Sequence, residues 1–465
     1  MSHVLDRRRA GVLCHITSLP GGDLGADVER FLDLLAACGM SVWQVLPLNP
    51  PDEHHSPYCA SSLFAGNPAL LPAAFAAVAP GDGATGPAAP TFWLRDFAIF
   101  GVARAWFAAP WTSWPAPLRD RQPAALADFI REHAAQIALV EAQQLQFIAA
   151  WGRVRAAAAA RGILLFGDLP LYPAPDSADV WAHRALFQLD GAGHPAYVAG
   201  VPPDYFSPTG QLWGNPVYDW NAHAADGYAW WRARLHHAAA LFDIVRIDHF
   251  RGLAAYWRVP AGAPDASAGT WAAGPGAALF TAASAATAAP AKTAGLVAED
   301  LGDITPDVDA LRDALQLPGM RVLQFGFSGD VANSHLPAHA PEQCVYYTGT
   351  HDNDTTLGWY RALDAPVRGQ VDALLAAGAA RPAAARPMPW PLIDLALSSP
   401  ANTAIVPLQD LLGLDGDHRM NVPGSTRGNW TWQFDWRQIP ADFAPQVREL
   451  LEGSDRLVRP VGVDR

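Results

Sequence analysis

Short apolar runs that end in polar residues and Gly or Pro recur along the whole chain. Eight of them have the length and composition of strands, and the segments between them carry helical patterns. The runs are GVLCHITSLP (11–20), SVWQVLPLNP (41–50), GILLFGDLP (162–170), FDIVRIDHF (242–250), GLVAEDLG (295–302), MRVLQFGF (320–327), CVYYTGTHD (344–352) and TAIVPLQDLLG (403–413). Because such strands are apolar throughout, they predict a parallel sheet that is covered on both faces.

Two of the intervening segments show helical spacing clearly. The first has an apolar face with i, i+3, i+4, i+7 spacing, made of Phe31, Leu34, Leu35 and Cys38. Gly39 follows this face at the position of a helix C-cap. A longer helix precedes the third run, with a face made of Ile137, Val140, Phe147, Trp151 and Val154, and we expect it to end at Gly162. Helices therefore connect the strands.

Eight strands linked in this way predict an α/β fold, a (β/α)8 TIM barrel with its chemistry at the C-terminal ends of the strands. The alternative is an open doubly wound sheet. It is less favoured because no GxGxxG motif opens a helix after the first run, and GPGAAL (274–279) is an incomplete match. We predict a single catalytic barrel domain over residues 1–465. Because the gaps between the eight runs are unequal, we also predict helical and loop insertions at about 67–155, 172–240, 254–290 and 353–402, around the C-terminal face of the barrel.

Composition narrows the function classes. The chain has 465 residues, 50% of them hydrophobic, and a net charge of −13. That charge argues against nucleic acid or an anionic membrane as a partner. No stretch reaches the roughly 20 strongly apolar residues of a spanning helix, and no signal peptide pattern follows the basic residues near the start, so we expect a cytoplasmic protein. The four cysteines are far apart, which favours neither a disulfide scaffold nor a zinc site.

Three acidic residues fall at the ends of the fourth, fifth and seventh runs: Asp248, Glu299 and Asp352. In a parallel barrel all three would lie at one mouth. Positions i and i+2 of a strand share a face, so Arg246 and Asp248 project together. The guanidinium favours an ionised Asp248, which suits a nucleophile.

Glu299 is followed by Asp300, and strand alternation sends one of these carboxyl groups into the mouth and the other away from it. An acid in an apolar setting has a raised pKa and can donate a proton. Two carboxyl groups with divided environments are suited to glycoside cleavage, with retention of configuration where they stand about 5 Å apart. Asp352 would stabilise the positively charged transition state, and His351 could donate a hydrogen bond to a sugar hydroxyl.

Two other interpretations stay open at this point. A site for Mg²⁺ or Mn²⁺ could use the oxygen and imidazole donors Asp248, His249, Glu299, Asp300, His351 and Asp352. Against it, Arg246 would repel a cation and no HExxH motif is present. In the second interpretation, Asp248 forms a structural ion pair with Arg246. Asp352 is then a helix N-cap and Glu299 a rim residue.

The segments VRIDHFRGL (245–253), VAEDLG (297–302) and TGTHDNDT (348–355), in this order, resemble the catalytic segments of the amylomaltases. These are the 4-alpha-glucanotransferases of glycoside hydrolase family 77, within the alpha-amylase clan. The resemblance extends to HITSLP (15–20), SPYCASSLFAGNP (56–68), GDLPLYPAPDSADVW (167–181), VAGVPPDYFSPTGQLWGNPVYDW (198–220) and RMNVPGSTRGNWTW (419–432). It implies that Asp248 is the nucleophile, Glu299 the general acid and base, and Asp352 the transition-state stabiliser. Arg246 and His351 would support them.

The resemblance also implies residues that bind the glucan. A lid over the substrate would include Tyr205, Phe206 and Ser207, and the sugar subsites would include Ser56, Tyr58, Trp213, Asn215 and Asn421. Donor and acceptor would be maltooligosaccharides and alpha-1,4-glucans, joined by a double displacement that needs no metal or organic cofactor. A hydrolase of the alpha-amylase clan is the closest alternative, and a non-catalytic glucan-binding protein is the alternative from another class.

Overall fold

The computed structural model describes residues 4–73, 92–203, 207–285, 294–378, 383, 385–425 and 427–457. Each of the eight predicted runs overlaps one strand, and together these strands form one parallel sheet in the order β10-β11-β12-β1-β2-β3-β6-β9. Their bounds are β1 (Arg9–Leu13), β2 (Val42–Gln44), β3 (Leu164–Leu169), β6 (Ile244–Ile247), β9 (Gly295–Ala298), β10 (Gly319–Val322), β11 (Cys344–Tyr347) and β12 (Thr403–Pro407).

The two outer strands of this sheet, β9 and β10, meet and close a barrel. The Ala298 N–H donates to the Pro318 carbonyl at 2.9 Å, and the Met320 N–H donates to the Asp300 carboxylate at 2.6 Å. The predicted (β/α)8 barrel is confirmed, and the alternative of an open doubly wound sheet is wrong.

Alternate residues of the barrel strands point inward and outward. One cluster fills the interior and includes Leu13, Val42, Phe166, Ile244, Val297, Val322, Val345 and Ile405. Neighbouring strand residues, including Val12, Trp43, Leu165, Val245, Ala298 and Val406, belong to the larger cluster between the sheet and the helices. The strands are therefore apolar on both faces, which explains why they read as continuous apolar runs.

Both predicted helices are present. Helix α1 (Ala26–Cys38) ends at Gly39, whose φ of 79° is left-handed. Helix α6 (Ala134–Ala160) ends just before Gly162, which has a φ of 70°. Leu34 and Val140 are only partly buried, because they lie at the edges of the two apolar faces.

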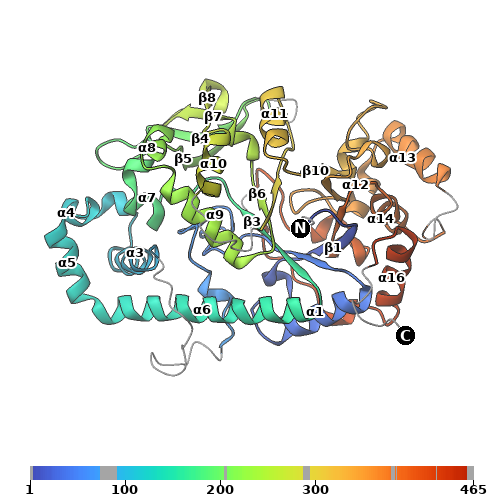
Figure 1. The fold of residues 1–465 in the computed structure, drawn as a ribbon, viewed down its shortest axis with the longest axis horizontal. Coiled ribbons are helices and arrows are strands. Elements are labelled where there is room, and N and C mark those ends of the chain that lie inside the picture. Colours follow the sequence, from blue (N-terminus) through green and yellow to red (C-terminus); the bar gives the residue numbers. More distant parts are fainter. Residues whose placement is uncertain are drawn as a thin grey trace.

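Figure 1 shows α6 running along one side of the molecule, with α3, α4 and α5 gathered at one end and α12, α13, α14 and α16 at the other. The remaining α-helices in the described part are α3 (Leu94–Phe107), α4 (Ala116–Arg119), α5 (Pro123–Glu132), α7 (Ala178–Ala182), α8 (Trp220–Ala225), α9 (Ala229–Leu241), α10 (Ala277–Ala285), α11 (Pro306–Ala314), α12 (Thr356–Ala362), α13 (Ala365–Ala377), α14 (Trp390–Leu397), α15 (Leu408–Leu411) and α16 (Phe443–Gly453). None of the helices in the described ranges is both long and apolar enough to span a bilayer.

A second sheet is built from the inserted segments. It is antiparallel, in the order β5-β4-β7-β8, with the bounds β4 (Tyr197–Val201), β5 (Gln211–Pro216), β7 (Ala255–Pro260) and β8 (Thr270–Ala273). The sequence pattern predicted only helices and loops in these insertions, so this sheet was missed. The boundaries of the single domain and of its four insertions stay a prediction.

Candidate active site

Strand β6 carries the first two site residues on its inward side. Ile244 lies in the barrel interior and Val245 packs outward, so Arg246 and then Asp248 turn inward again. The Arg246 side chain is 7% exposed, and its Nη2 lies 2.9 Å from Asp248 Oδ1. Arg246 and Asp248 therefore project together, as the sequence predicts.

Arg246 joins three carboxylates that come from three different strand ends. Its Nη1 donates to Asp168 Oδ2 at 2.6 Å, and its Nη2 lies 3.8 Å from Glu299 Oε2, in addition to the contact with Asp248. Asp168 follows Phe166 on the inward side of β3, and its side chain is fully buried. One buried guanidinium thus organises the acidic groups of β3, β6 and β9.

These contacts limit the distance between Asp248 and Glu299. The same Arg246 nitrogen lies 2.9 Å from Asp248 Oδ1 and 3.8 Å from Glu299 Oε2, so the two oxygens are no further apart than the sum of these distances. That limit excludes most of the ~6.5–9.5 Å range of inverting glycosidases and includes the ~5–5.5 Å of retaining ones.

Glu299 is held in place by backbone donors. Its Oε2 accepts the His249 N–H at 2.7 Å and its Oε1 accepts the Leu301 N–H at 2.9 Å. His249 has a left-handed backbone, with φ of 49°, in the turn that aims this N–H at Glu299. Asp300 points away from the mouth and pairs with Arg312 and Arg321, as strand alternation predicts.

The protonation of Asp248 differs from the expectation drawn from the sequence. Burial raises the pKa of Asp248 to about 8, although Arg246 lowers it, and the negative charges of Asp168 and Glu299 raise it further. Burial likewise raises the pKa of Glu299. Arg246 does not keep Asp248 fully ionised, because three carboxylates share this one cation. Near neutral pH the free site therefore retains a proton on the Asp248 and Glu299 pair.

Asp352 lies on the loop after β11. Its Oδ1 accepts a hydrogen bond from the Asn421 side-chain amide at 2.6 Å, and its Oδ2 lies 3.3 Å from His351 Nε2. The Arg419 guanidinium donates to the Asp352 carbonyl at 2.9 Å. The N-cap of α12 is Thr355, so the interpretation of Asp352 as a helix cap is wrong.

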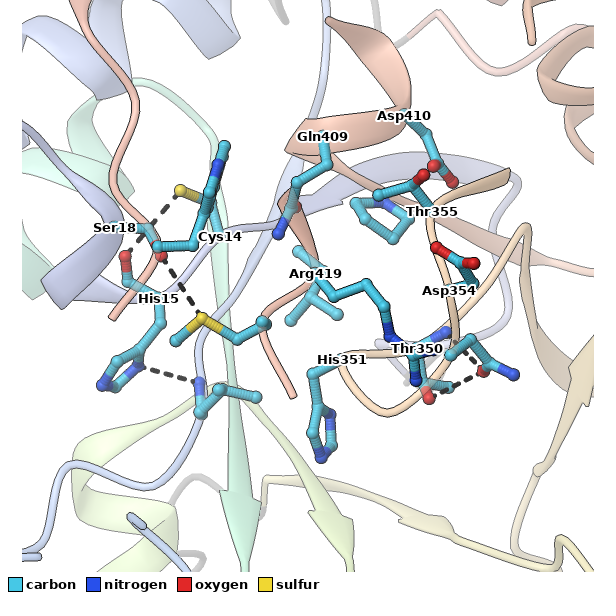
Figure 2. Close-up of a pocket in the computed structure, with 16 residues that line it drawn as sticks. Cys14, His15, Ser18, Thr350, His351, Asp354, Thr355, Gln409, Asp410 and Arg419 are labelled. Atoms are coloured by element: carbon cyan, nitrogen blue, oxygen red, sulfur yellow. Dashed lines mark hydrogen bonds between the residues drawn. The ribbon is translucent and has the colours of Figure 1, made fainter. Parts of the chain in front are cut away.

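Asp410, in the short helix α15 that follows β12, anchors both ends of this loop. Its Oδ2 accepts the Thr348 and Thr356 hydroxyls, each at 2.6 Å, and its Oδ1 accepts the Thr356 N–H at 2.7 Å. Figure 2 shows the small pocket beside the loop, with His351 and Arg419 on one side and His15 on the other. The buried carboxylate of Asp410 thus fixes the two ends of the loop that presents Asp352.

Tyr58 connects the two halves of the mouth. Its ring stacks on His351 with the centroids 5.2 Å apart, and its hydroxyl donates to Asp168 Oδ2 at 2.7 Å. Trp430 lies beside both rings, at 5.7 Å from Tyr58 and 5.9 Å from His351. These three rings form an aromatic wall next to the carboxylates.

The remaining candidate residues lie in several places. The Trp213 ring is 37% exposed and packs edge-on against His249 at 4.7 Å. The Asn215 side chain donates to the Pro173 carbonyl, so it holds the chain in place. The Ser207 hydroxyl donates to the Gly210 carbonyl, and the Ser56 N–H donates to Asp52. Tyr205 and Phe206 lie outside the described residues.

The metal-binding interpretation gains no support from this geometry. The Arg246 guanidinium occupies the centre of the acidic groups, and Asp300 is tied to two arginines outside the mouth. In the ranges that the structure describes, no group of three or more His, Cys, Asp or Glu side chains is placed to hold a metal ion.

Sequence comparison identifies the family. The profile of glycoside hydrolase family 77, described as 4-alpha-glucanotransferase, matches residues 14–80 and 88–438. The chain belongs to the 4-alpha-glucanotransferase family. A 4-alpha-glucanotransferase of Thermus thermophilus is 40% identical over 504 residues, covering 97% of this chain and 99% of the relative. The chloroplastic/amyloplastic 4-alpha-glucanotransferase of Solanum tuberosum is 40% identical over 511 residues, covering 97% of this chain and 87% of the relative.

Solved structures agree with this assignment. The amylomaltase of Streptococcus agalactiae, solved in complex with acarbose, has a TM-score of 0.88 and 29% identity, covering 97% of this chain and 100% of that one. The amylomaltase of Corynebacterium glutamicum has a TM-score of 0.74 at 18% identity, covering 97% of this chain and 75% of that one, and shows the same fold. The predicted glucanotransferase enzyme of the amylomaltase family is confirmed.

Sequence reasoning missed several residues of the site. Asp168 has the same signal as the other acids, a carboxylate at the end of an apolar run, and that signal could have identified it. Asp410 lies within the eighth run, three residues after the last strand residue, Pro407, and carries a similar signal. Trp430 and the backbone of His249 carry no comparable signal, because their contacts depend on loop conformation.

Proposed function

We propose that this enzyme transfers alpha-1,4-glucan segments from a maltooligosaccharide donor to the 4-hydroxyl of an acceptor glucan or of glucose, by a retaining double displacement. The observation that carries the proposal is the contact of one buried guanidinium, Arg246, with the carboxylates of both Asp248 and Glu299. That contact holds a nucleophile and an acid close enough for retention.

In the first displacement, Asp248 attacks the anomeric carbon and Glu299 protonates the leaving glycosidic oxygen. The proton that the free site retains supplies this step, because Asp248 must be ionised and Glu299 protonated when the bond breaks. Arg246 lies 2.9 Å from Asp248 and 3.8 Å from Glu299, so it stabilises the negative charge that Asp248 must carry when the shared proton passes to Glu299 and the bond breaks.

In the second displacement, Glu299 acts as a base and removes the proton from the acceptor 4-hydroxyl, which attacks the anomeric carbon and frees Asp248. Asp352 stabilises the positive charge that develops on the sugar ring, and Asn421 and His351 hold its carboxylate. The wall of Tyr58, His351 and Trp430 offers an aromatic surface on which a sugar ring can lie.

Transfer exceeds hydrolysis only if an acceptor sugar occupies the site and water is excluded. We assign this role to the segment from Tyr205 to Ser207 and to Trp213, which packs on His249 next to the Asp248 turn. The proposal also includes a cytoplasmic location, and the four cysteines, all unpaired, are consistent with a reducing compartment.

The test is incubation of the purified protein with maltotriose alone in the presence of EDTA, followed by chromatography of all products. Glucose together with a ladder of longer maltodextrins is the expected result, and Asp248→Asn should abolish it. Glucose and maltose without longer products would indicate a hydrolase. Unchanged maltotriose would contradict the proposal of a transfer activity that needs no metal ion.

A further inference from the structure

The strand ladder of the barrel is interrupted between β9 and β10. The other neighbouring strands of the barrel pair in regular parallel register, whereas β9 and β10 stand at the two ends of the strand order. In the described residues, one backbone hydrogen bond crosses this seam, from the Ala298 N–H to the Pro318 carbonyl. This hydrogen bond lies at the residue immediately before Glu299, so the seam adjoins the peptide that carries Glu299.

The Asp300 side chain replaces the missing ladder. Its Oδ1 accepts the Met320 N–H of β10 at 2.6 Å, as a strand carbonyl would do. Its Oδ2 accepts hydrogen bonds from Arg312 at 2.7 Å and from Arg321 at 3.1 Å. The carboxylate is 1% exposed, so these charge-assisted contacts are shielded from solvent. Asp300 thereby ties β9 to β10 and to the intervening helix α11.

Gly319 makes this approach possible. A Cβ atom at Gly319 would lie 2.3 Å from Asp300 Oδ2, closer than any real contact. The position therefore has a steric requirement for glycine at the start of β10, where the carboxylate meets the strand.

The same short peptide presents Glu299 to the mouth. The Glu299 N–H donates to the Ile247 carbonyl at 3.1 Å, and the Leu301 N–H donates to Glu299 Oε1 at 2.9 Å. Asp300 lies between these two anchors and is the residue that holds the peptide to β10. Any shift of the seam would tilt this peptide and move the Glu299 carboxyl group relative to Asp248.

We propose that Asp300 is a positioning residue for Glu299: by closing the β9–β10 seam with its carboxylate, it sets the direction in which Glu299 delivers and removes a proton. This inference rests on the proposed role of Glu299 as general acid and base. Asp300 itself lies outside the mouth and does not reach the substrate.

The first test is Asp300→Asn, which keeps an oxygen for the Met320 N–H and removes the charge that pairs with the two arginines. We expect kcat with maltotriose to fall by roughly 10- to 100-fold, the effect of a displaced catalytic group, with KM changed less than about threefold. Gly319→Ala disturbs the same contact from the opposite strand and should reproduce this pattern. The matched control is Asp313→Asn, which removes an exposed partner of Arg312 and should leave both constants unchanged.

A donor that needs no acid separates positioning of Glu299 from general damage to the site. With α-maltosyl fluoride, Asp248 bonds to the anomeric carbon as the carbon–fluorine bond breaks, and fluoride leaves with the electron pair without a proton. Added azide then attacks the same carbon and displaces the Asp248 carboxylate, giving α-maltosyl azide, so no base is needed either. We expect Asp300→Asn, Gly319→Ala and Glu299→Gln to release fluoride within about threefold of the wild-type rate when azide is present.

Two results would overturn the inference: an equal loss on maltotriose and on the fluoride in Asp300→Asn, or an unchanged kcat with maltotriose. The other variants test the proposed function itself. If Asp248→Asn still forms the azide product, or if Glu299→Gln loses fluoride release as completely as it loses transfer, the assigned roles of these residues fail, independently of Asp300.

Discussion

Replacing Asp248 with Asn should stabilise the protein, and increasingly so as the pH rises. In the native state, burial raises the pKa of Asp248 to about 8, whereas in the unfolded chain it is about 3.9. Between these values the native state holds a proton that the unfolded chain has released. The native protein therefore loses stability as the pH rises through this window, and Asn, which does not titrate, removes that loss.

The magnitude follows from the difference between the two pKa values. About four pH units at about 1.4 kcal/mol each give an upper limit of roughly 5–6 kcal/mol. The Asp248 side chain is 26% exposed and shares its proton with Glu299, so we expect about 2–3 kcal/mol. With an unfolding entropy of about 2.1 cal/mol/K per residue, a chain of 465 residues shifts its Tm by about 1 °C for each kcal/mol.

The assay is thermal unfolding of the wild type and Asp248→Asn at pH 5 and pH 9, at one scan rate and one ionic strength. The Tm advantage of the variant should be about 2–3 °C larger at pH 9. Loss of an Arg246 partner adds an offset at both pH values, and the comparison between them removes it. Asp313→Asn, at an exposed carboxylate, should show no such change. A Tm gap that is constant or that narrows toward pH 9 would refute the reasoning.

Three further predictions concern the support of the site and the base of the barrel. Asp168→Asn should lower kcat at least 100-fold, because Arg246 loses its 2.6 Å anchor. Since the charge of Asp168 adds to burial in raising the pKa of Asp248, the acid limb of the kcat/KM profile should also move to lower pH, and an unmoved limb would contradict this. Tyr58→Phe should reduce kcat/KM about 10-fold through loss of one hydrogen bond to a carboxylate, and Tyr58→Ala should reduce it further, so equal effects would contradict a separate role for the ring. Arg456→Leu removes a guanidinium that donates to five buried or partly buried backbone carbonyls and should lower the Tm by about 3–5 °C while activity at low temperature persists, and an unchanged Tm would argue against a stabilising role for these contacts.

The barrel strands could be predicted because burial of both faces leaves a pattern within each strand's own sequence. A parallel strand that is covered on both faces must be apolar along its length, so each of the eight strands overlaps one of the apolar runs recognised in the sequence. The antiparallel sheet was not predictable in this way. Its strands are partly exposed, so they do not form continuous apolar runs in the sequence. In addition, more than fifty residues separate β4 from its partner β7, so no tight hairpin turn predicts this pairing.

Within the site, the sequence by itself determined which side chains reach the mouth. The two-residue period of a strand places Arg246 with Asp248, and separates Glu299 from Asp300, whatever the rest of the fold does. Only the tertiary structure decided their protonation and separation. Both depend on how many carboxylates share Arg246, and on the burial that β3, β6 and β9 impose when they converge on it. Electrostatic energies in a buried site are set by distances across strands, which a pattern along one chain does not contain.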